Sequence, residues 1–578
     1  MSFISTSALR GVAPAVIRRD VTFCTLWLAV AMCAYSQSLD GSTRADWPHY
    51  GGSQAAWRFS ALDQINTTNV GNLVPVWLFQ TGDYAEGLHS TPIVRDGVLY
   101  LITPRNQVFA LDGATGRLIW QYKPATPRQG RAGGQVYVLN RGLALAEGKL
   151  FFGSTDNSLV ALDEKTGREV WRVAVDDAKQ CGCDITAAPL IVKDKVVIGG
   201  TGGDAAHRGY LTAFNIETGR LAWRWYVIPG PGEEGHETWK GDSWKYGGGA
   251  PWMTGSYDPD LNLVYWGTGN ASGDFNDNDR NPGANANGEI NLYTASVVAL
   301  DADTGKLRWY RQEVPDDLWD FDSAFEVILF DRQVRGQMRK LLAHMNKSGL
   351  TFVLDRMTGE VIRAFTVPEE QNWISGVTEE GKLIGRRDPV VGEPVDICPS
   401  VEGGKNWNSM AYSPRTGFLY APVFEMCNTI TANPQEPEEG RFRANGRMTM
   451  HLPPNRSTYG HLDAWDPLTG KRVWSVPSKY PLLASVLTTA GDLVFTGDPE
   501  GNYFALDARD GKKLWSYKTG AGHRGSAISY SVNGRQYIAT PTGWQQSETG
   551  GFVASVFPDQ NFRGGSTLIV FALREGIK

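Results

Sequence analysis

One short pattern recurs along the chain and limits the folds that it can adopt. Each copy has an apolar segment ending in Ala-x-Asp, then a Thr-Gly turn and a segment ending in Trp, with Asn for Asp in the third copy and Asp for Thr in the sixth. The clear copies are Ala110–Trp120, Ala161–Trp171, Ala213–Trp223, Ala299–Trp309, Ala464–Trp474 and Ala505–Trp515. Asp caps a turn with its own side chain and Gly takes a positive φ, so each copy predicts two strands joined by a tight turn.

The spacing of the copies predicts how these strand pairs assemble. Trp120, Trp171 and Trp223 are 51 and 52 residues apart, and Trp474 and Trp515 are 41 apart. A period of this length with several short strands is typical of propeller blades. Two weaker copies, at 353–362 and 411–420, raise the number to eight. We therefore predict an all-β, eight-bladed β-propeller in which each Trp docks against the neighbouring blade.

The first 36 residues differ from the rest of the chain. Arg10, Arg18 and Arg19 precede an apolar run from Val21 to Cys33, and small residues follow at 34 and 36. This order is typical of a secretory signal peptide, and the run is short for a membrane span. We predict a signal peptide at 1–36, a propeller at 37–578 and a periplasmic location; an uncleaved N-terminal anchor is the alternative.

Charge and cysteine content narrow the possibilities further. A net charge of −6 without a basic run argues against nucleic acid as a partner. In an oxidising compartment, an even number of cysteines favours disulfides. Cys398 and Cys427 are expected to pair. Cys181 and Cys183 either form a strained bridge across one glycine or act as a metal pair, and the second option lacks a partner pair at zinc spacing.

The repeat resembles the tryptophan-docking motif of the quinoprotein dehydrogenases that depend on pyrroloquinoline quinone (PQQ), the methanol, alcohol and glucose dehydrogenase group. The segment 47–73 is similar to that family's N-terminal signature, so the resemblance covers nearly the whole mature chain. Repeats of this kind also occur in propellers without catalytic activity. The motifs between the repeats therefore carry the functional prediction.

The strongest of these motifs spans 244–253 and is followed by Gly-Thr-Gly-Asn at 267–270. The resemblance implies that Trp252 stacks under the flat PQQ ring and that Asn270 is a metal ligand. Three consecutive glycines allow the backbone to approach a ligand closely, and an exposed indole suits a planar one. The alternative for Trp252 is another docking tryptophan, although it lies outside the repeat register.

The segment 315–325 contains the predicted catalytic group. The resemblance places the catalytic base at Asp320. Asp322, two residues on, lies on the same face of an extended segment, and two close carboxylates call for a cation between them. An acidic residue at 322 resembles the lanthanide-dependent members of the family. A solvated acidic loop is the alternative.

A third motif contributes Thr186 and the pair Gly203 and Asp204. The resemblance implies that Thr186 and Gly203 contact the cofactor and that Asp204 binds the metal, where the family has a glutamate one methylene longer. Aspartate also binds calcium. The alternative is that Asp204 only caps a turn after two glycines.

Single residues at other family positions complete the predicted cofactor site. Arg141 would pair with a PQQ carboxylate, Lys347 would lie near the quinone oxygens, and Asn406, Gly543 and Trp544 would contact the cofactor. His89 stands where the family has an acidic residue against PQQ, which puts its role in doubt.

The resemblance implies a PQQ- and metal-dependent dehydrogenase with Ca²⁺ or a lanthanide ion, acting on an alcohol, a polyol or a sugar. No Cys-x-x-Cys-His motif is present, so the expected electron acceptor is a separate cytochrome c or a quinone. A homodimer is one possible oligomeric state of this chain. The alternative from another functional class is a non-catalytic propeller that serves as a scaffold or binding protein. Such a protein has no reason to keep the predicted site residues in family order, namely Trp252, Asn270, Asp320 and Lys347.

Overall fold

The computed structural model describes residues 45–84, 86–125, 138–154, 156–544, 548–574 and 576. The predicted signal peptide at 1–36 lies outside the described residues. Within them the regular secondary structure consists almost entirely of strands, as the repeat predicts. In the described part, the helical segments are short: Val70–Asn72, Ala178–Cys181 (α2), His236–Thr238, Ser243–Tyr246 and Glu548–Val556 (α3). No described helix is long and apolar enough to cross a membrane.

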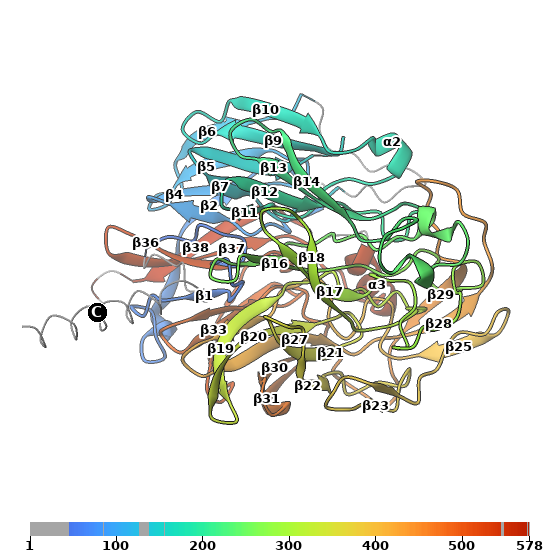
Figure 1. Ribbon diagram of the computed structural model, residues 1–578. Coiled ribbons are helices and arrows are strands. Elements are labelled where there is room, and N and C mark those ends of the chain that lie inside the picture. Colours follow the sequence, from blue (N-terminus) through green and yellow to red (C-terminus); the bar gives the residue numbers. More distant parts are fainter. Residues whose placement is uncertain are drawn as a thin grey trace, which may run out of the picture.

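Most strands belong to antiparallel sheets of four strands that follow chain order (Figure 1). The first three sheets are β3–β6 (Ile93–Arg95, Val98–Ile102, Val108–Asp112, Leu118–Tyr122), β7–β10 (Ala144–Ala146, Lys149–Gly153, Ser158–Asp163, Glu169–Ala174) and β11–β14 (Leu190–Val192, Lys195–Gly199, Tyr210–Asn215, Leu221–Tyr226). The next two are β15–β18 (Ser256–Asp258, Leu263–Gly267, Ser296–Asp301, Leu307–Gln312) and β19–β22 (Ile328–Val334, Gln337–Met345, Leu350–Asp355, Val361–Thr366).

The C-terminal half continues the same arrangement. Its sheets are β26, β27, β30 and β31 (Ala411–Ser413, Phe418–Phe424, Gly460–Asp466, Lys471–Ser478), then β32–β35 (Leu487–Thr489, Leu493–Gly497, Asn502–Asp507, Lys513–Lys518) with β1 (Phe59–Ser60) added in parallel at its edge. The last sheet combines both ends of the described chain. It joins β36, β37 and β38 (Ile528–Val532, Arg535–Thr542, Thr567–Leu573) to the early strand β2 (Leu73–Gln80), which lies beside β38 in Figure 1.

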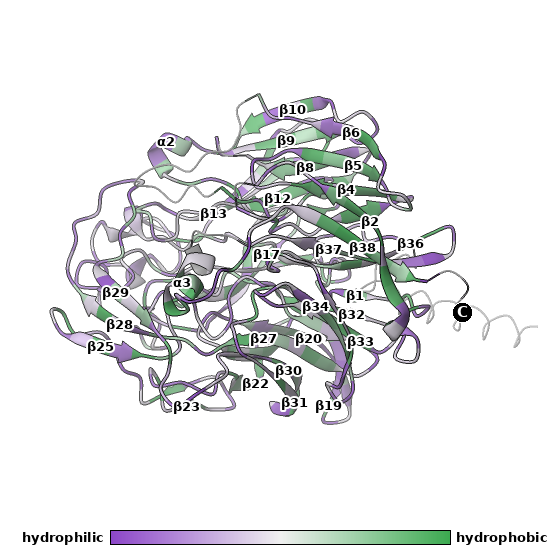
Figure 2. Cartoon of the chain, turned by 180° about the vertical axis from the view of Figure 1, so that it is seen from behind, coloured by the Kyte–Doolittle hydropathy of each residue, from purple (hydrophilic) through white to green (hydrophobic). Residues whose placement is uncertain are grey.

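Tryptophan contacts link most of the sheets to the next one along the chain. Trp120 of β6 donates a hydrogen bond from Nε1 to the carbonyl of Glu164 at 3.0 Å, in the following sheet. Gly167 lies so close to the same ring that an added Cβ would be 2.4 Å from it. The same donor contact to the following sheet recurs for Trp77, Trp171, Trp223, Trp309, Trp474 and Trp515. Inner strands of the sheets, such as β4, β5 and β8, are apolar and appear green in Figure 2, whereas β10, which carries Trp171, is partly polar.

One predicted copy of the repeat is in the wrong register. Six clear copies and the weak copy at 353–362 join the third strand of a sheet to its fourth. The copy at 411–420 instead joins β26 to β27, the first and second strands of its sheet. The sheet that lacks a copy is the one shared between the chain ends, where Trp77 of β2 supplies the contact.

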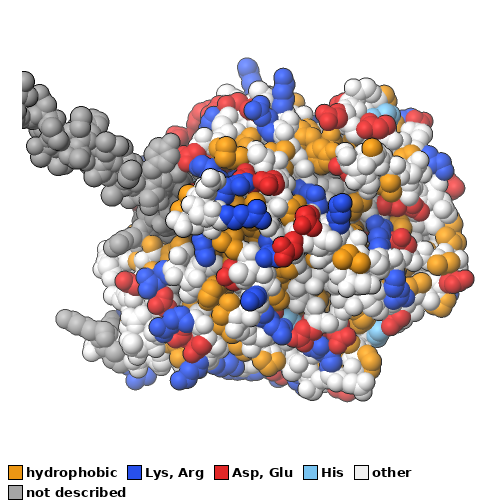
Figure 3. Space-filling view, turned by 60° about the horizontal axis from the view of Figure 1, so that its bottom comes forward, with side chains coloured by type: hydrophobic (Ala, Val, Ile, Leu, Met, Phe, Trp, Pro, Cys, Tyr) orange, Lys and Arg blue, Asp and Glu red, His pale blue; other side chains and the backbone are white. Residues whose placement is uncertain are grey.

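Smaller elements extend from these sheets. β25, β28 and β29 (Pro394–Ile397, Cys427–Ala432, Gly446–His451) form a three-stranded sheet, and β23 and β24 (Gly376–Val377, Leu383–Ile384) form a hairpin. The disulfide Cys398–Cys427 joins the end of β25 to the start of β28, as predicted. On the face shown in Figure 3, basic and acidic side chains are interspersed.

Candidate active site

A cavity of about 400 Å³ lies where loops from many sheets converge. Its walls come from loops that precede the first strand of a sheet or join its second and third strands. Both kinds of loop lie at the same end of an antiparallel sheet, whereas the repeat turns, between third and fourth strands, lie at the other end. The predicted residues that line the cavity are Arg141, Thr186, Gly203, Asp204, Trp252, Asp320, Asp322, Lys347 and Asn406.

One part of the wall is aromatic and carries a cation. The guanidinium of Arg141 lies 4.9 Å from the ring centres of both Trp252 and Trp407. It also donates to the hydroxyl of Thr186, and the backbone N–H of Arg141 donates to the carbonyl of Thr186 at 2.8 Å. Trp252 is further held by an edge contact with Phe325, at 5.5 Å between ring centres. The two indoles and the guanidinium are thus packed in place before any ligand binds.

Next to this aromatic part, the wall is a cluster of carboxylates around one ammonium group. Lys347 Nζ lies 2.8 Å from Asp320 Oδ2 and 3.4 Å from Asp322 Oδ2. Asp322 Oδ1 accepts hydrogen bonds from the backbone N–H of Asn270 at 3.0 Å and from Trp252 Nε1 at 3.3 Å. Asp322 therefore connects the aromatic wall, the Gly-Thr-Gly-Asn turn and Lys347.

The electrostatics of this cluster are dominated by burial. Burial raises the pKa of Asp320 well above its usual value; Lys347 opposes the change, and the neighbouring carboxylates of Asp204, Asp322 and Asp274 add to it. For Lys347, burial lowers the pKa, but the carboxylates of Asp320 and Asp322 outweigh burial and raise it well above its usual value. The protein alone therefore gathers more negative charge than one lysine balances.

Asp320 has a backbone conformation that non-glycine residues rarely adopt, with φ at +58°. The carboxylate of Asp317 holds this turn, because it accepts the backbone N–H groups of Trp319 at 3.0 Å and Phe321 at 2.6 Å. Asp320 Oδ2 faces Lys347, while its buried Oδ1 has no hydrogen-bond partner among the described residues. Strained backbone with an unsatisfied polar atom is typical of a functional site.

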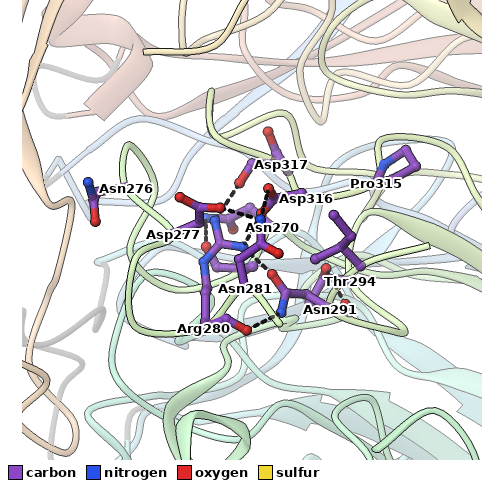
Figure 4. A network of polar contacts seen from close by, with 12 residues as sticks. Asn270, Asn276, Asp277, Arg280, Asn281, Asn291, Thr294, Pro315, Asp316 and Asp317 are labelled. Carbon is purple, nitrogen blue, oxygen red and sulfur yellow. Dashed lines mark hydrogen bonds and ion pairs between the residues drawn. The ribbon is translucent and has the colours of Figure 1, made fainter. Parts of the chain in front are cut away.

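A second polar network braces the same turn from behind (Figure 4). The buried guanidinium of Arg280 donates to Asp316 Oδ1 at 2.8 Å, to the carbonyl of Asp317 at 2.8 Å and to the side chain of Asn291. Asn281 donates to Asp316 Oδ2 at 2.8 Å. This network, here called the Arg280 network, ties the loop after Asn270 to the loop that carries Asp320.

Several wall residues were not predicted from the sequence. Asp274, four residues after Asn270, lines the cavity, and its Oδ1 accepts a hydrogen bond from Asn270 Nδ2 at 3.0 Å. Glu402 lines it as well and accepts from Asn406 Nδ2 at 3.0 Å. No signal in the sequence separates Asp274 from the other acidic residues of its loop, Asp277 and Asp279. Trp407 directly follows Asn406 in the segment 403–407, so the motif that identified Asn406 also contains Trp407.

Four predicted residues are not part of the wall. Asn270 is buried directly behind it, between Asp322, Asp274 and Gly203. His89 is fully buried behind Trp407, at 5.5 Å between ring centres. Trp544 is buried one layer further out, where its ring packs at 5.0 Å from that of Phe562, and Gly543 adjoins it.

The bridge between Cys181 and Cys183 is formed. Both side chains are buried, and Asn157 Nδ2 lies 3.6 Å and 3.3 Å from the two sulfur atoms. Neither cysteine lines the cavity. Cys183 packs behind Gly202, a wall residue, so the bridge supports the wall rather than facing a ligand.

The donor set fits the groups that the family resemblance implies. Carboxylate and amide oxygens are the ligands that Ca²⁺ prefers, and Asp204, Asp320 and Asp322 bring three carboxylates to the cavity wall beside Asn270. The indole of Trp252 offers a flat surface next to this cluster, and Arg141 offers a fork for a carboxylate.

Comparison with known proteins agrees with this geometry. Residues 47–380 and 363–538 match the family model "PQQ: Glucose/ethanol/alcohol dehydrogenase, beta-propeller domain". The chain is 38% identical to the quinohemoprotein alcohol dehydrogenase of Comamonas testosteroni over 86% of its length and 73% of that protein. It is 37% identical to the quinoprotein alcohol dehydrogenase PedH of Pseudomonas putida, over 89% of each chain. A europium-containing methanol dehydrogenase superposes with a TM-score of 0.86 and 33% identity over 92% of this chain and 99% of that one.

Proposed function

This chain belongs to the family of PQQ-dependent quinoprotein dehydrogenases, and from that premise we propose that it oxidises an alcohol with Asp320 as the base. The observation that carries the proposal is the position of Asp320 in the cavity wall. Its Oδ2 faces Lys347, and its Oδ1 is buried without a hydrogen-bond partner among the described residues. An oxygen in that state can take a proton from a bound hydroxyl group.

The two halves of the wall suit the two groups that the enzyme would bind. Arg141, Thr186, Gly203, Trp252 and Asn406 would hold PQQ, with its ring against the Trp252 indole. Asp204, Asn270, Asp320 and Asp322 would hold Ca²⁺ or a lanthanide ion, of which the europium in the similar methanol dehydrogenase is an example. When bound, PQQ supplies an electrophilic carbonyl that accepts a hydride.

Asp320 and Lys347 divide the proton chemistry between them. Lys347 pairs with Asp320 Oδ2 and, as a cation, favours the ionised form of this carboxylate. The other oxygen, Oδ1, is then left to accept the proton of the substrate hydroxyl. The Arg280 network keeps the strained turn of Asp320 in place during this transfer. The substrate carbon gives up its hydride and becomes an aldehyde or a ketone.

The apolar residues that line the cavity favour a substrate alcohol with an apolar chain, rather than a polyol or a sugar. These residues are Phe275, Val401, Phe442, Met448 and Phe552, which offer no hydrogen bonds to extra hydroxyl groups. Burying each hydroxyl without a partner costs about 1–3 kcal/mol. Apolar chains gain free energy in the same surroundings.

We also propose that the four-stranded sheets form one eight-bladed propeller. Support comes from the tryptophan contacts, which run to the next sheet from all but one of the sheets, and from the pairing of β2 with β38. In the gap between β22 and β31, where no tryptophan donor contact is found among the described residues, the stacked pair of Phe365 and Trp465 joins the two sheets.

We further propose a periplasmic location and a separate electron acceptor. The predicted signal peptide and the two disulfides support a periplasmic enzyme, because disulfides persist in oxidising compartments. Reduced cofactor would pass its electrons to a separate cytochrome c or to a quinone.

The proposal is tested by reconstituting the purified protein with PQQ and either Ca²⁺ or La³⁺. A dye-linked assay would then compare 1-hexanol and 2-phenylethanol with glycerol and glucose. We expect turnover with the two apolar alcohols and little with the others. Glucose oxidation as fast as hexanol oxidation would refute the substrate class, and no turnover with any substrate would refute the enzyme itself.

A further inference from the structure

Asp274 differs from the other acidic residues of its loop. Asp277 accepts a hydrogen bond from the Asn281 amide and Asp279 Oδ2 accepts one from Arg443 at 2.7 Å, and neither carboxylate lines the cavity. Asp274 is 3% exposed, lines the cavity and accepts the amide hydrogen of Asn270. Asp274 therefore adds a fourth aspartate to the cavity wall, besides Asp204, Asp320 and Asp322.

The hydrogen bond from Asn270 fixes which amide atom faces the cation site. An asparagine side chain presents either its oxygen or its nitrogen, and only the oxygen binds a metal ion. Because Nδ2 donates to Asp274, Oδ1 points the other way, toward Gly203 and the neighbouring Asp204. A Cβ on residue 203 would come within 3.0 Å of that oxygen, so glycine leaves the space that it needs.

The charge of the wall gives Asp274 a second effect. The described wall residues include five carboxylates, those of Asp204, Asp274, Asp320, Asp322 and Glu402, against two cations, Lys347 and Arg141. Arg141 is engaged with Thr186 and the two indoles. A carboxylate attracts a trivalent ion half again as strongly as a divalent one at the same distance. Each added carboxylate therefore shifts the preference toward the trivalent ion.

We propose that Asp274 is a specificity-determining residue of the cation site, where it orients the Asn270 amide and favours a trivalent lanthanide over Ca²⁺. The inference rests on the proposed function, since it concerns the cation of that same site. It assigns the preference to a wall residue outside the predicted ligand set rather than to Asp322 alone.

The experiment measures bound metal rather than activity. Protein incubated with PQQ is equilibrated with mixtures of La³⁺ and Ca²⁺, freed of unbound ions and analysed for both elements by mass spectrometry. The variant Asp274→Asn keeps an oxygen that can accept the Asn270 amide hydrogen but removes the charge. We expect its preference for La³⁺ over Ca²⁺ to fall by about tenfold or more. Asp274→Ala also loses the acceptor, so its total bound metal should fall as well.

Asp277→Asn is the matched control, because it removes a charge from the same loop that does not face the cavity. It should keep the wild-type ratio of La³⁺ to Ca²⁺. An unchanged ratio in Asp274→Asn, or an equal loss of both ions, overturns the inference while leaving the proposed function standing. A wild-type protein that binds neither ion in the presence of PQQ overturns the proposed function, and this inference with it.

Discussion

Two acid-rich regions are built from the same two loops, yet their charges are balanced differently. In the Arg280 network, Asp316 has an arginine at 2.8 Å and an asparagine amide at 2.8 Å. In the cavity cluster, Lys347 is shared by Asp320 and Asp322, and Asp320 Oδ1 has no partner among the described residues. A satisfied carboxylate fixes the backbone, whereas carboxylates in excess around a cavity can bind a cation.

A third group of residues shows that proximity alone does not make a metal site. Glu369, Glu425 and His461 lie close enough for their ligand atoms to share an ion. However, Arg456 and Arg472 contact Glu369 at 2.9 Å and 2.6 Å, and His461 lies 2.9 Å from Glu425. These cations occupy the positions that a metal would need, as Arg280 does in the Arg280 network.

Removing the base should have the largest effect on the cavity cluster. Asp320→Asn keeps the shape of the side chain but cannot accept the hydroxyl proton. We expect turnover to fall by at least about 100-fold. Steady-state kinetics of the reconstituted enzyme measure the change, and the PQQ content shows that the cofactor still binds. Undiminished turnover with bound PQQ would rule out Asp320 as the base.

Removing the cation of the Arg280 network should affect stability instead. Arg280→Met leaves Asp316 buried without its arginine, which costs about 3–5 kcal/mol in the free energy of unfolding. Urea unfolding measures this difference. As a control, Arg441→Met removes an exposed arginine paired with Glu438 and should change stability by less than about 1 kcal/mol. A similar small loss in both variants would show that the network does not hold the turn.

The pH dependence of stability sharpens the same contrast. Burial raises the pKa of Asp316 to about 6, although Arg280 opposes the change. Because this pKa lies above the unfolded value, the folded state binds the proton more tightly. The contribution of Asp316 to stability is therefore complete below about pH 4 and is lost as the pH rises through 6.

Comparison with Asp316→Asn isolates this contribution, since the variant cannot titrate. We expect the stability of the wild type relative to the variant to increase by about 2–3 kcal/mol between pH 7 and pH 4. Unfolding curves at a series of pH values measure it. A difference that stays constant over this range would contradict the assignment.

The smallest effect is expected for the bridge behind Gly202. Replacing Cys181 and Cys183 with serine should lower stability by about 1–2 kcal/mol, because the closed loop is very short. Since neither sulfur lines the cavity, turnover of the reconstituted enzyme should stay at the wild-type level. A large loss of turnover would contradict the purely supporting role assigned to the bridge.

The sheets could be predicted from the sequence because the information is local. Turn residues and a tryptophan at a fixed offset specify each hairpin and its contact with the next sheet. The same local character explains the wrong register at 411–420, since a tight turn between a first and a second strand uses the same residue types as one between a third and a fourth.

The cavity could be predicted only in part, because its walls come from loops far apart in the sequence. Residues in family motifs, such as Trp252, Asp320 and Lys347, were found and do meet in the cavity. Asp274 was missed because it lies in a loop rich in Asn and Asp, where only the folded structure distinguishes it from Asp277. His89 and Trp544 stand at family positions but are buried one layer behind the wall.

A crystal structure of the protein loaded with PQQ and La³⁺ would show whether a cation and a quinone share this cavity, because the anomalous signal of the ion marks its position. We predict one strong peak within about 2.6 Å of Asn270 Oδ1 and of the Asp320 carboxylate, beside a quinone lying on Trp252. A peak at another site, or a cavity that stays without cation and quinone under these conditions, would contradict the proposed function.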